Sequence, residues 1–152
     1  MVTILLPQTK HSSPLTRYTD CDLIEETMTS IPILGWVACG QPIDMFEQTE
    51  TIDVPNRLVK RNTYALRVRG DSMRDANILP GDLVIIEQSQ TAEHGEKVVV
   101  RINGQSVTLK TLSLEPDGVK LIPANTEMEP LVFHNTDVEV LGIVRGVIRD
   151  RV

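Results

Sequence analysis

Apolar and polar residues alternate along most of the chain from about residue 49 onward, a pattern that predicts β-strands. Apolar positions recur at every second residue or form short β-branched runs, with turn-forming residues between them. No segment after residue 75 has the spacing of a long helix. We therefore predict a mainly β fold, a compact, partly closed and mainly antiparallel sheet assembly. The expected strands are 51–54, 64–68, 83–87, 97–102, 106–112, 119–122, 131–133 and 138–148.

Turn signals divide these strands. Asn103-Gly104 separates two β-branched runs, and both central residues of a type I′ turn need positive φ, so residues 98–112 are predicted to form a hairpin. Pro80-Gly81-Asp82 and Pro116-Asp117-Gly118 are also expected to be turns. We expect Asp82 to close its own turn through its side chain.

The N-terminal part of the chain has a different character. Residues 1 to about 30 are rich in Ser, Thr, Pro and charge, which is typical of a flexible arm. Residues 31–37 are apolar but contain a proline and a glycine, and they lead into Ala38-Cys39-Gly40-Gln41-Pro42. Small residues and proline predict an exposed extended loop here.

Composition and charge limit the binding partners, cofactors and cellular location that we expect. The 152 residues suit one domain, and the net charge of −6 without a long basic cluster argues against direct DNA binding. The two cysteines, Cys21 and Cys39, form neither a disulfide framework nor a CxxC metal site, so no metal or other cofactor is expected. The apolar stretch after Met1 is too short to span a membrane, and a cytoplasmic location is expected.

The densest candidate chemistry lies in residues 67–74. A β run stops at Gly70 and is followed by Asp71-Ser72, which places a serine at a bend. Backbone N–H groups at such a bend are unpaired and can stabilise an oxyanion. On local grounds alone, the favoured interpretation is that the Ser72 side chain caps a turn or a helix.

A serine nucleophile needs a base. The three histidines, His11, His94 and His134, lie in the arm, in a turn and at a strand end, where surface positions are expected. Lys110 lies inside the apolar run 107–112, where burial would lower the pKa of its amine and make it a base for a Ser–Lys dyad. The alternative is that Lys110 occupies the exposed face of an edge strand.

Four segments in register resemble the LexA/UmuD family of self-cleaving proteins in order, spacing and residue type, and the likeness extends over about residues 34–150. The segments are Arg69-Gly70-Asp71-Ser72-Met73, residues 78–85, residues 94–99 and residues 107–110. The likeness continues through residues 121–125 and 142–148.

The resemblance implies a serine endopeptidase that cuts its own chain. Ser72 corresponds to the nucleophile, Lys110 to its base, and the backbone N–H groups of Asp71 and Ser72 to the oxyanion hole. The scissile bond corresponds to Cys39-Gly40. Residues 1–39 would then be an arm removed by self-cleavage, and residues 40–152 a catalytic and dimerisation β domain.

The same resemblance implies a role in the SOS response to DNA damage, with cleavage stimulated by the RecA filament on single-stranded DNA. Docking of a loop over residues 31–45 would be the stimulated step. A homodimer is expected through residues 138–148, a strand that we expect to present an exposed edge. The Cys-Gly pair and the lack of room for a DNA-binding head suggest a UmuD-like subunit for a Y-family translesion polymerase.

Three alternatives stay open on the sequence. The chain can be the C-terminal domain of a LexA-type repressor or a phage-borne regulator without its DNA-binding head. It can be a non-catalytic binding module. It can also be a protease similar to signal peptidase, although no segment is long enough for the membrane anchor of that class.

Overall fold

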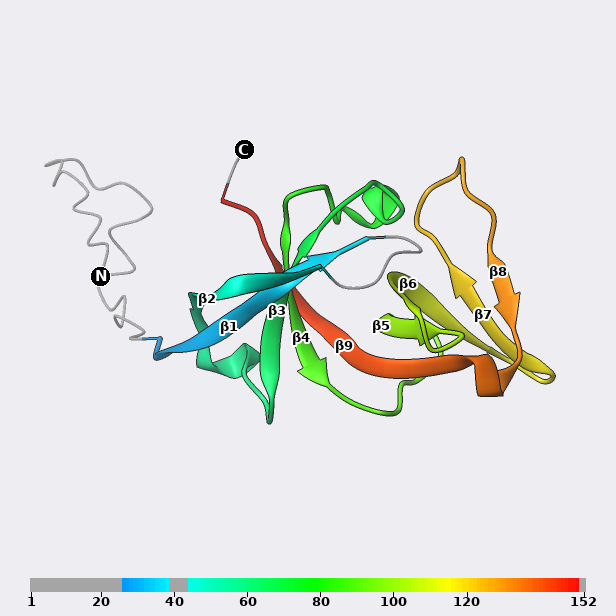
Figure 1. Cartoon of the computed structure of the whole chain (residues 1–152), viewed down its shortest axis with the longest axis horizontal. Coiled ribbons are helices and arrows are strands. Elements are labelled where there is room, and N and C mark those ends of the chain that lie inside the picture. Colours follow the sequence, from blue (N-terminus) through cyan, green and yellow to red (C-terminus); the bar gives the residue numbers. More distant parts are fainter. Residues whose placement is uncertain (1–25, 39–43, 151–152) are drawn as a thin grey trace, which may run out of the picture.

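The computed structural model describes residues 26–38 and 44–150, and these form a single nine-stranded sheet (Figure 1). The sheet order is β2-β1-β3-β4-β9-β5-β6-β7-β8. Only the β1–β3 pair is parallel among the described strands, and the sheet is not closed into a barrel. The strands are β1 (Met28–Val37), β2 (Asp44–Pro55), β3 (Thr63–Val68), β4 (Leu83–Gln88), β5 (Lys97–Ile102), β6 (Ser106–Glu115), β7 (Gly118–Ile122), β8 (Leu131–Phe133) and β9 (Val138–Ile148).

Helical structure in the described residues is confined to three single turns of 3-10 helix, Asn56–Leu58 (η2), Arg74–Ala76 (η3) and Asn135–Asp137 (η4). The prediction of a mainly β, mostly antiparallel fold is confirmed. The predicted hairpin is also confirmed, because β5 and β6 pair from Lys97–Thr111 to Ile102–Ser106. Asn103 at its turn has a φ of 51°.

The prediction of an exposed loop at residues 31–37 is wrong. These residues belong to β1, which lies inside the sheet between β2 and β3. Ile31, Ile33 and Val37 are at most 3% exposed, so the apolar residues at alternate positions face the core. Pro32 and Gly35 suggested a loop, but the strand accommodates them with a register shift between Ile33 and Gly35. Period-two burial therefore outweighs the local turn signals.

The expectation that β9 is an exposed edge is also wrong. β9 lies between β4 and β5, and Gly142 and Ile143 at its middle pair with both neighbours. Its first half pairs with β5 and its second half with β4, so this one strand joins the two halves of the sheet (Figure 1).

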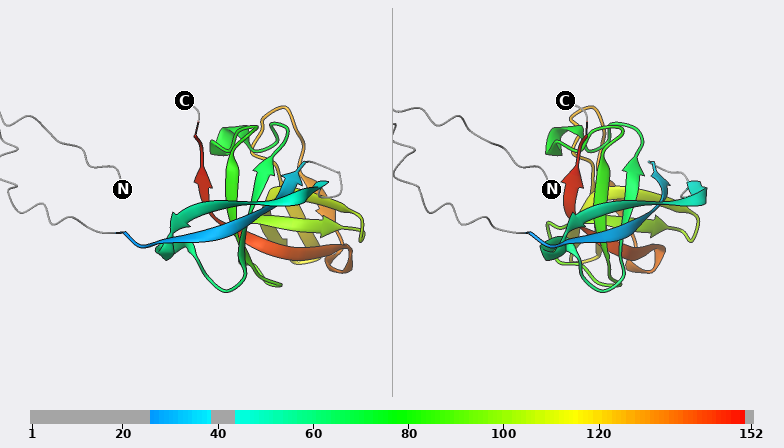
Figure 2. Two further views of the ribbon diagram at one scale, coloured as in Figure 1. Left: turned by 60° about the vertical axis from the view of Figure 1, so that its left-hand side comes forward. Right: turned by 90° about the vertical axis from the view of Figure 1, so that its left-hand side faces the viewer.

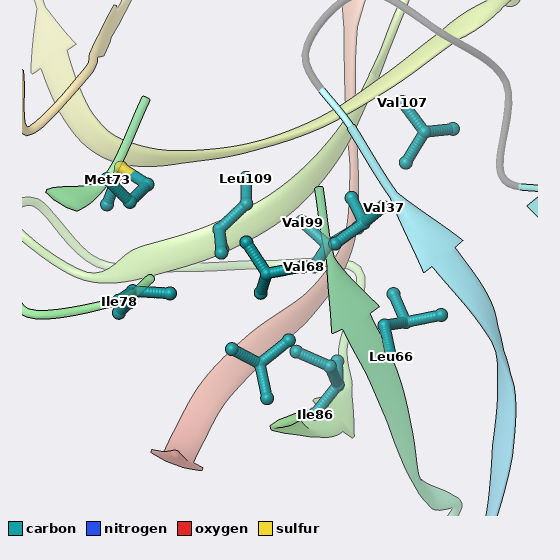
Figure 3. Close-up of a cluster of buried hydrophobic side chains, with 10 residues drawn as sticks. Val37, Leu66, Val68, Met73, Ile78, Ile86, Val99, Val107 and Leu109 are labelled. Carbon is teal, nitrogen blue, oxygen red and sulfur yellow. The ribbon is translucent and has the colours of Figure 1, made fainter. Parts of the chain in front are cut away.

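The joined sheet is strongly twisted, and its two halves enclose a shared core (Figure 2). One buried cluster draws side chains from β1, β3, β4, β5 and β6 and from the segment after β3 (Figure 3). In that cluster Val37 of β1, Val68 of β3 and Leu109 of β6 converge, although they are distant in the sequence. The same twist brings the end of β3 next to β6, where the candidate chemistry lies.

An ion pair between the buried Asp82 and the partly exposed Arg149 fixes the turn between β3 and β4 to the residue that follows β9. Asp82 is 2% exposed, its Oδ2 accepts a hydrogen bond from the Leu79 N–H at 2.8 Å, and the Arg149 guanidinium donates to both carboxylate oxygens at 2.7 Å. The expectation that Asp82 closes its turn is confirmed. The hydrogen bonds from Arg149 lower the pKa of Asp82, although burial acts in the opposite direction.

Asp82→Asn should therefore lower the free energy of unfolding at roughly pH 7, because it removes the charge that Arg149 binds; the loss should be about 1 kcal/mol, since solvent screens the Arg149 side chain, which is 33% exposed. The pKa of Asp82 in the folded protein lies below the unfolded value of about 3.9, so this stabilisation is complete above about pH 5. It is lost as the pH falls through the lower, folded value. Urea denaturation at roughly pH 7 and pH 3 measures the difference, and an equal difference at both pH values contradicts this account.

Gly142 allows the close approach of β4 to β9. A Cβ atom there would lie 2.3 Å from Ile86 Cγ2 and 2.9 Å from the Glu87 carbonyl oxygen. Gly142→Ala should lower the free energy of unfolding by roughly 1–3 kcal/mol, because β4 and β9 must move apart at Gly142 to make room for the added Cβ atom. Gly146→Ala in the same strand is the matched control, since the added Cβ would meet the flexible Leu58 side chain at 3.3 Å. Thermal unfolding of both variants tests this, and equal losses contradict it.

Candidate active site

Ser72 lies in the turn that leaves β3. Gly70 has a φ of +75°, a left-handed conformation that glycine adopts without strain and that directs the chain away from the strand. Met73 is 2% exposed and packs into the core cluster, which anchors the turn directly beside Ser72. The capping role considered for Ser72 is wrong, because η3 has Met73 at its N-cap and no side-chain cap hydrogen bond.

Lys110 is buried in β6 with 1% of its surface exposed. β6 lies between β5 and β7 in the sheet, so the alternative of an exposed edge strand is wrong. Its Nζ lies 3.1 Å from Ser72 Oγ, and it donates to Thr108 Oγ1 at 2.7 Å and to the Leu109 carbonyl oxygen at 3.0 Å. Oxygen atoms therefore surround an amine whose burial would otherwise be costly.

Thr108 is a site residue that the sequence analysis missed. It is 2% exposed and lies two positions before Lys110, so both side chains leave the same face of β6. Its hydroxyl oxygen accepts the hydrogen bond from the Lys110 amine. The available signal was the Thr-x-Lys spacing inside an apolar strand, which has no meaning until the lysine is known to be buried.

A small cleft at Ser72 borders the end of β1. Its lining residues are Val37, Ala38, Val68, Arg69, Ser72, Met73 and Leu109. The Arg69 N–H donates to the Val37 carbonyl oxygen at 2.9 Å, which extends the parallel pairing of β1 with β3 to this point. The predicted cleavage residues Cys39 and Gly40 lie outside the described residues, immediately after Ala38.

Neither of the two described histidines, His94 and His134, borders this cleft. His94 Nδ1 accepts a hydrogen bond from the Leu114 N–H, and the side chain of His134 caps η4 through Thr136. Both are exposed, as expected, and His11 lies outside the described residues. Within residues 26–38 and 44–150, no group of His, Cys, Asp and Glu side chains could hold a metal ion.

A larger cavity of about 590 Å³ lies elsewhere, bordered by Trp36, Arg67, Asp82 and Arg149 among others. The Asp82 carboxylate is already bound by Arg149, and the guanidinium of Arg69 lies over the Trp36 ring, 4.7 Å from its centre. No described serine borders this cavity, whereas the small cleft is bordered by Ser72, whose Oγ lies 3.1 Å from Lys110 Nζ. In the described part of the chain no helix has the length and apolar character needed to cross a membrane.

Comparisons with known proteins show the family of the chain. The Peptidase S24-like family matches residues 32–145, and the chain belongs to this family. It is 44% identical over 129 residues to a LexA repressor of Herpetosiphon aurantiacus, covering 79% of this chain and 60% of that protein. It is 45% identical over 122 residues to a LexA repressor of Alcanivorax borkumensis, covering 79% and 59%.

The resemblance to the LexA/UmuD family is thereby confirmed. The chain spans about three fifths of the length of these curated relatives. We therefore treat the activity and the partners of this chain as proposals, which follow in the next subsection.

Thr108→Val should slow the reaction of Ser72 with a serine-directed fluorophosphonate by roughly ten- to hundredfold, because the amine loses the hydroxyl that positions it. The substitution keeps the shape of the side chain. Thr111→Val in the same strand is the matched control, since it makes the same chemical change on the face of β6 opposite to Lys110. Mass spectrometry of the labelled protein measures the rate, and equal labelling of both variants contradicts the assigned role of Thr108.

Proposed function

We propose that this domain cleaves its own chain between Cys39 and Gly40, with Ser72 as nucleophile and Lys110 as general base. The observation that supports this most strongly is the cleft itself. Ala38, the residue before Cys39, borders the same space as Ser72, whose Oγ lies 3.1 Å from the buried Lys110 Nζ. The proximity of Ser72, Lys110 and the residue before Cys39 supports the proposal.

The chemistry follows from these positions. Ser72 Oγ forms a bond to the Cys39 carbonyl carbon while its proton passes to the neutral amine of Lys110. The resulting oxyanion accepts hydrogen bonds from the backbone N–H groups of Asp71 and Ser72. The bond to the Gly40 nitrogen then breaks, that nitrogen takes the proton from Lys110, and water hydrolyses the ester on Ser72.

β1 acts in this proposal as the enzyme's own substrate strand. Ile33 to Val37 pair with Ala65 to Val68 of β3, and Val37 is 2% exposed. Because the residues before the proposed cut are already held as a strand, the segment that follows them loses less freedom when it reaches the nucleophile, and such positioning is a large part of catalytic rate enhancement. Because β1 is an interior strand on the N-terminal side of the proposed cut, removal of residues 1–39 also requires β1 to separate from β2 and β3.

This arrangement restricts the docking step that we expected for residues 31–45. Residues 31–37 belong to the sheet, so we propose that stimulation by the RecA–single-stranded DNA filament favours the reactive placement of the residues that follow Val37. In this proposal the filament increases the fraction of molecules in which these residues are placed for reaction, and it supplies no catalytic group.

The proposed biological setting is the SOS response, in the cytoplasm. The curated relatives reported above carry the name LexA repressor, which favours the alternative of a LexA-type regulatory domain over a polymerase subunit. A UmuD-like role in translesion synthesis remains a second candidate, supported by the Cys39-Gly40 pair. The two candidates are separated by expressing the chain in cells that lack their UmuD-like subunit. Restored DNA-damage mutagenesis supports the polymerase subunit, and unrestored mutagenesis supports the LexA-type regulatory domain.

We also propose a homodimer. β9 is central in the sheet, but Val144 to Ile148 pair with β4 alone, and Val147 in that half is 40% exposed. This half of β9 therefore remains the part of residues 138–148 that could meet a second copy. Sedimentation equilibrium measures the state, and a monomer at all concentrations rules the dimer out.

Ser72→Ala and Lys110→Ala should each reduce self-cleavage by at least about a thousandfold, because each removes one half of the dyad. In the unmodified chain the rate should rise with pH, because only the neutral amine accepts the serine proton. Time courses of intact mass at several pH values, with and without the RecA filament, measure both effects.

Ser106→Ala and Lys97→Ala are the matched controls, since both residues lie in the β5–β6 hairpin away from the cleft. They should cleave at the unmodified rate. Cleavage that persists in either dyad variant removes that residue from the mechanism, and a rate independent of pH argues against a lysine base.

A further inference from the structure

The loop after β7 binds the turn that carries Ser72. Asn125 in this loop is 5% exposed, and its Nδ2 donates a hydrogen bond to the Asp71 carbonyl oxygen at 3.0 Å. Its Oδ1 accepts a hydrogen bond from the Glu127 N–H at 2.9 Å. A carbonyl oxygen can only accept and a backbone N–H can only donate, so the two partners fix the orientation of the Asn125 amide. Both ends of this buried side chain are therefore in use.

The Nδ2 end of Asn125 binds the carbonyl group of the peptide bond between Asp71 and Ser72. No described peptide bond is cis, so the Asp71 C=O and the Ser72 N–H point in opposite directions from one plane. The Asp71 oxygen accepts a second hydrogen bond, from the Arg74 N–H at 3.1 Å. Two donors thus hold the C=O on one side, which directs the Ser72 N–H to the other. In residues 26–38 and 44–150 no hydrogen bond from this N–H is found.

We propose that Asn125 is a positioning residue for the oxyanion hole, which holds the Asp71–Ser72 peptide so that the Ser72 N–H can donate to the carbonyl under attack. The inference rests on the proposed self-cleavage. A donor fixed before the reaction stabilises developing charge without reorganisation, and this preorganisation accounts for much of oxyanion stabilisation. A hydrogen bond to the C=O of a peptide also polarises it and strengthens its N–H as a donor.

The competing explanation is that Asn125 only holds the two segments together. Other hydrogen bonds join the same two segments and have no further effect on the Asp71–Ser72 peptide. Asp75 Oδ2 accepts a hydrogen bond from the Thr126 N–H at 3.0 Å, and the Asp75 N–H donates to the Ala124 carbonyl oxygen at 2.7 Å. These bonds join the same loop to the same turn without contacting the Asp71 carbonyl. The side chain of Asp75 therefore offers a matched control.

The test compares Asn125→Asp, Asn125→Ala and Asp75→Ala with the unmodified chain. Asn125→Asp has the same shape and keeps an acceptor for the Glu127 N–H, but it places an oxygen against the Asp71 carbonyl. Asn125→Ala removes the donor without adding charge. Both should slow self-cleavage roughly ten- to hundredfold, less than or equal to the cost of losing an oxyanion donor outright. Asp75→Ala should stay within about twofold of the unmodified rate.

The pH profile separates positioning of the oxyanion hole from an effect on the base. In Asn125→Ala the plateau rate should fall while the midpoint of the profile stays in place, because Lys110 keeps its contacts with Ser72 and Thr108. Circular dichroism and thermal unfolding establish that each variant is folded. If Asn125→Asp does not fold, Asn125→Ala decides the question.

Three results overturn the inference and leave self-cleavage standing: unmodified rates in both Asn125 variants, an equal loss in Asp75→Ala, or a shifted midpoint in Asn125→Ala. An unmodified chain that never cleaves in the same experiment overturns the proposed function, and this inference with it. The unmodified chain therefore distinguishes the two failures.

Discussion

The contact between the Lys110 amine and the Ser72 hydroxyl depends on the burial of a lysine in the interior of a β-sheet. Nearly complete removal of an amine from water is unfavourable unless oxygen atoms replace the water. Here Thr108, Leu109 and Ser72 supply oxygen atoms within 3.1 Å. The fold accepts an energetic cost at this point, and such costs concentrate at functional sites.

This burial is possible because of the way the sheet is assembled. β9 pairs with β4 along one half and with β5 along the other, so the two halves of the sheet enclose one core. β6 is consequently buried on both faces over residues 107–110, and the turn after β3 lies against it. Gly142 and the Asp82–Arg149 pair both serve this assembly, one by permitting a close approach and the other by fixing a turn to the residue that follows β9.

Local sequence patterns predicted most of the strands but not their neighbours. The strands from residue 97 to 122, for example, follow from β-branched runs and from Asn103-Gly104, and both signals act over a few residues. β1 was assigned incorrectly as a loop because Pro32 and Gly35 are local breakers, whereas its burial depends on β2 and β3. The central position of β9 likewise depends on pairing across the whole sheet.

The same distinction applies to the site. Ser72 and Lys110 are 38 residues apart, and local chemistry favoured a cap for one and a surface position for the other. Only the family resemblance brought them together before the structure was known. Thr108 and Asn125 were missed because a hydroxyl and an amide acquire their roles from the groups they meet, and those groups lie on other segments of the chain or become buried only on folding.

The most direct test of the central claim is the N-terminal sequence of the large fragment formed when the purified chain is incubated at alkaline pH or with the RecA filament. The account predicts a single new N-terminus, Gly40-Gln41-Pro42, that is absent from Ser72→Ala. A chain that stays intact under both conditions, or a new N-terminus at another residue, contradicts it.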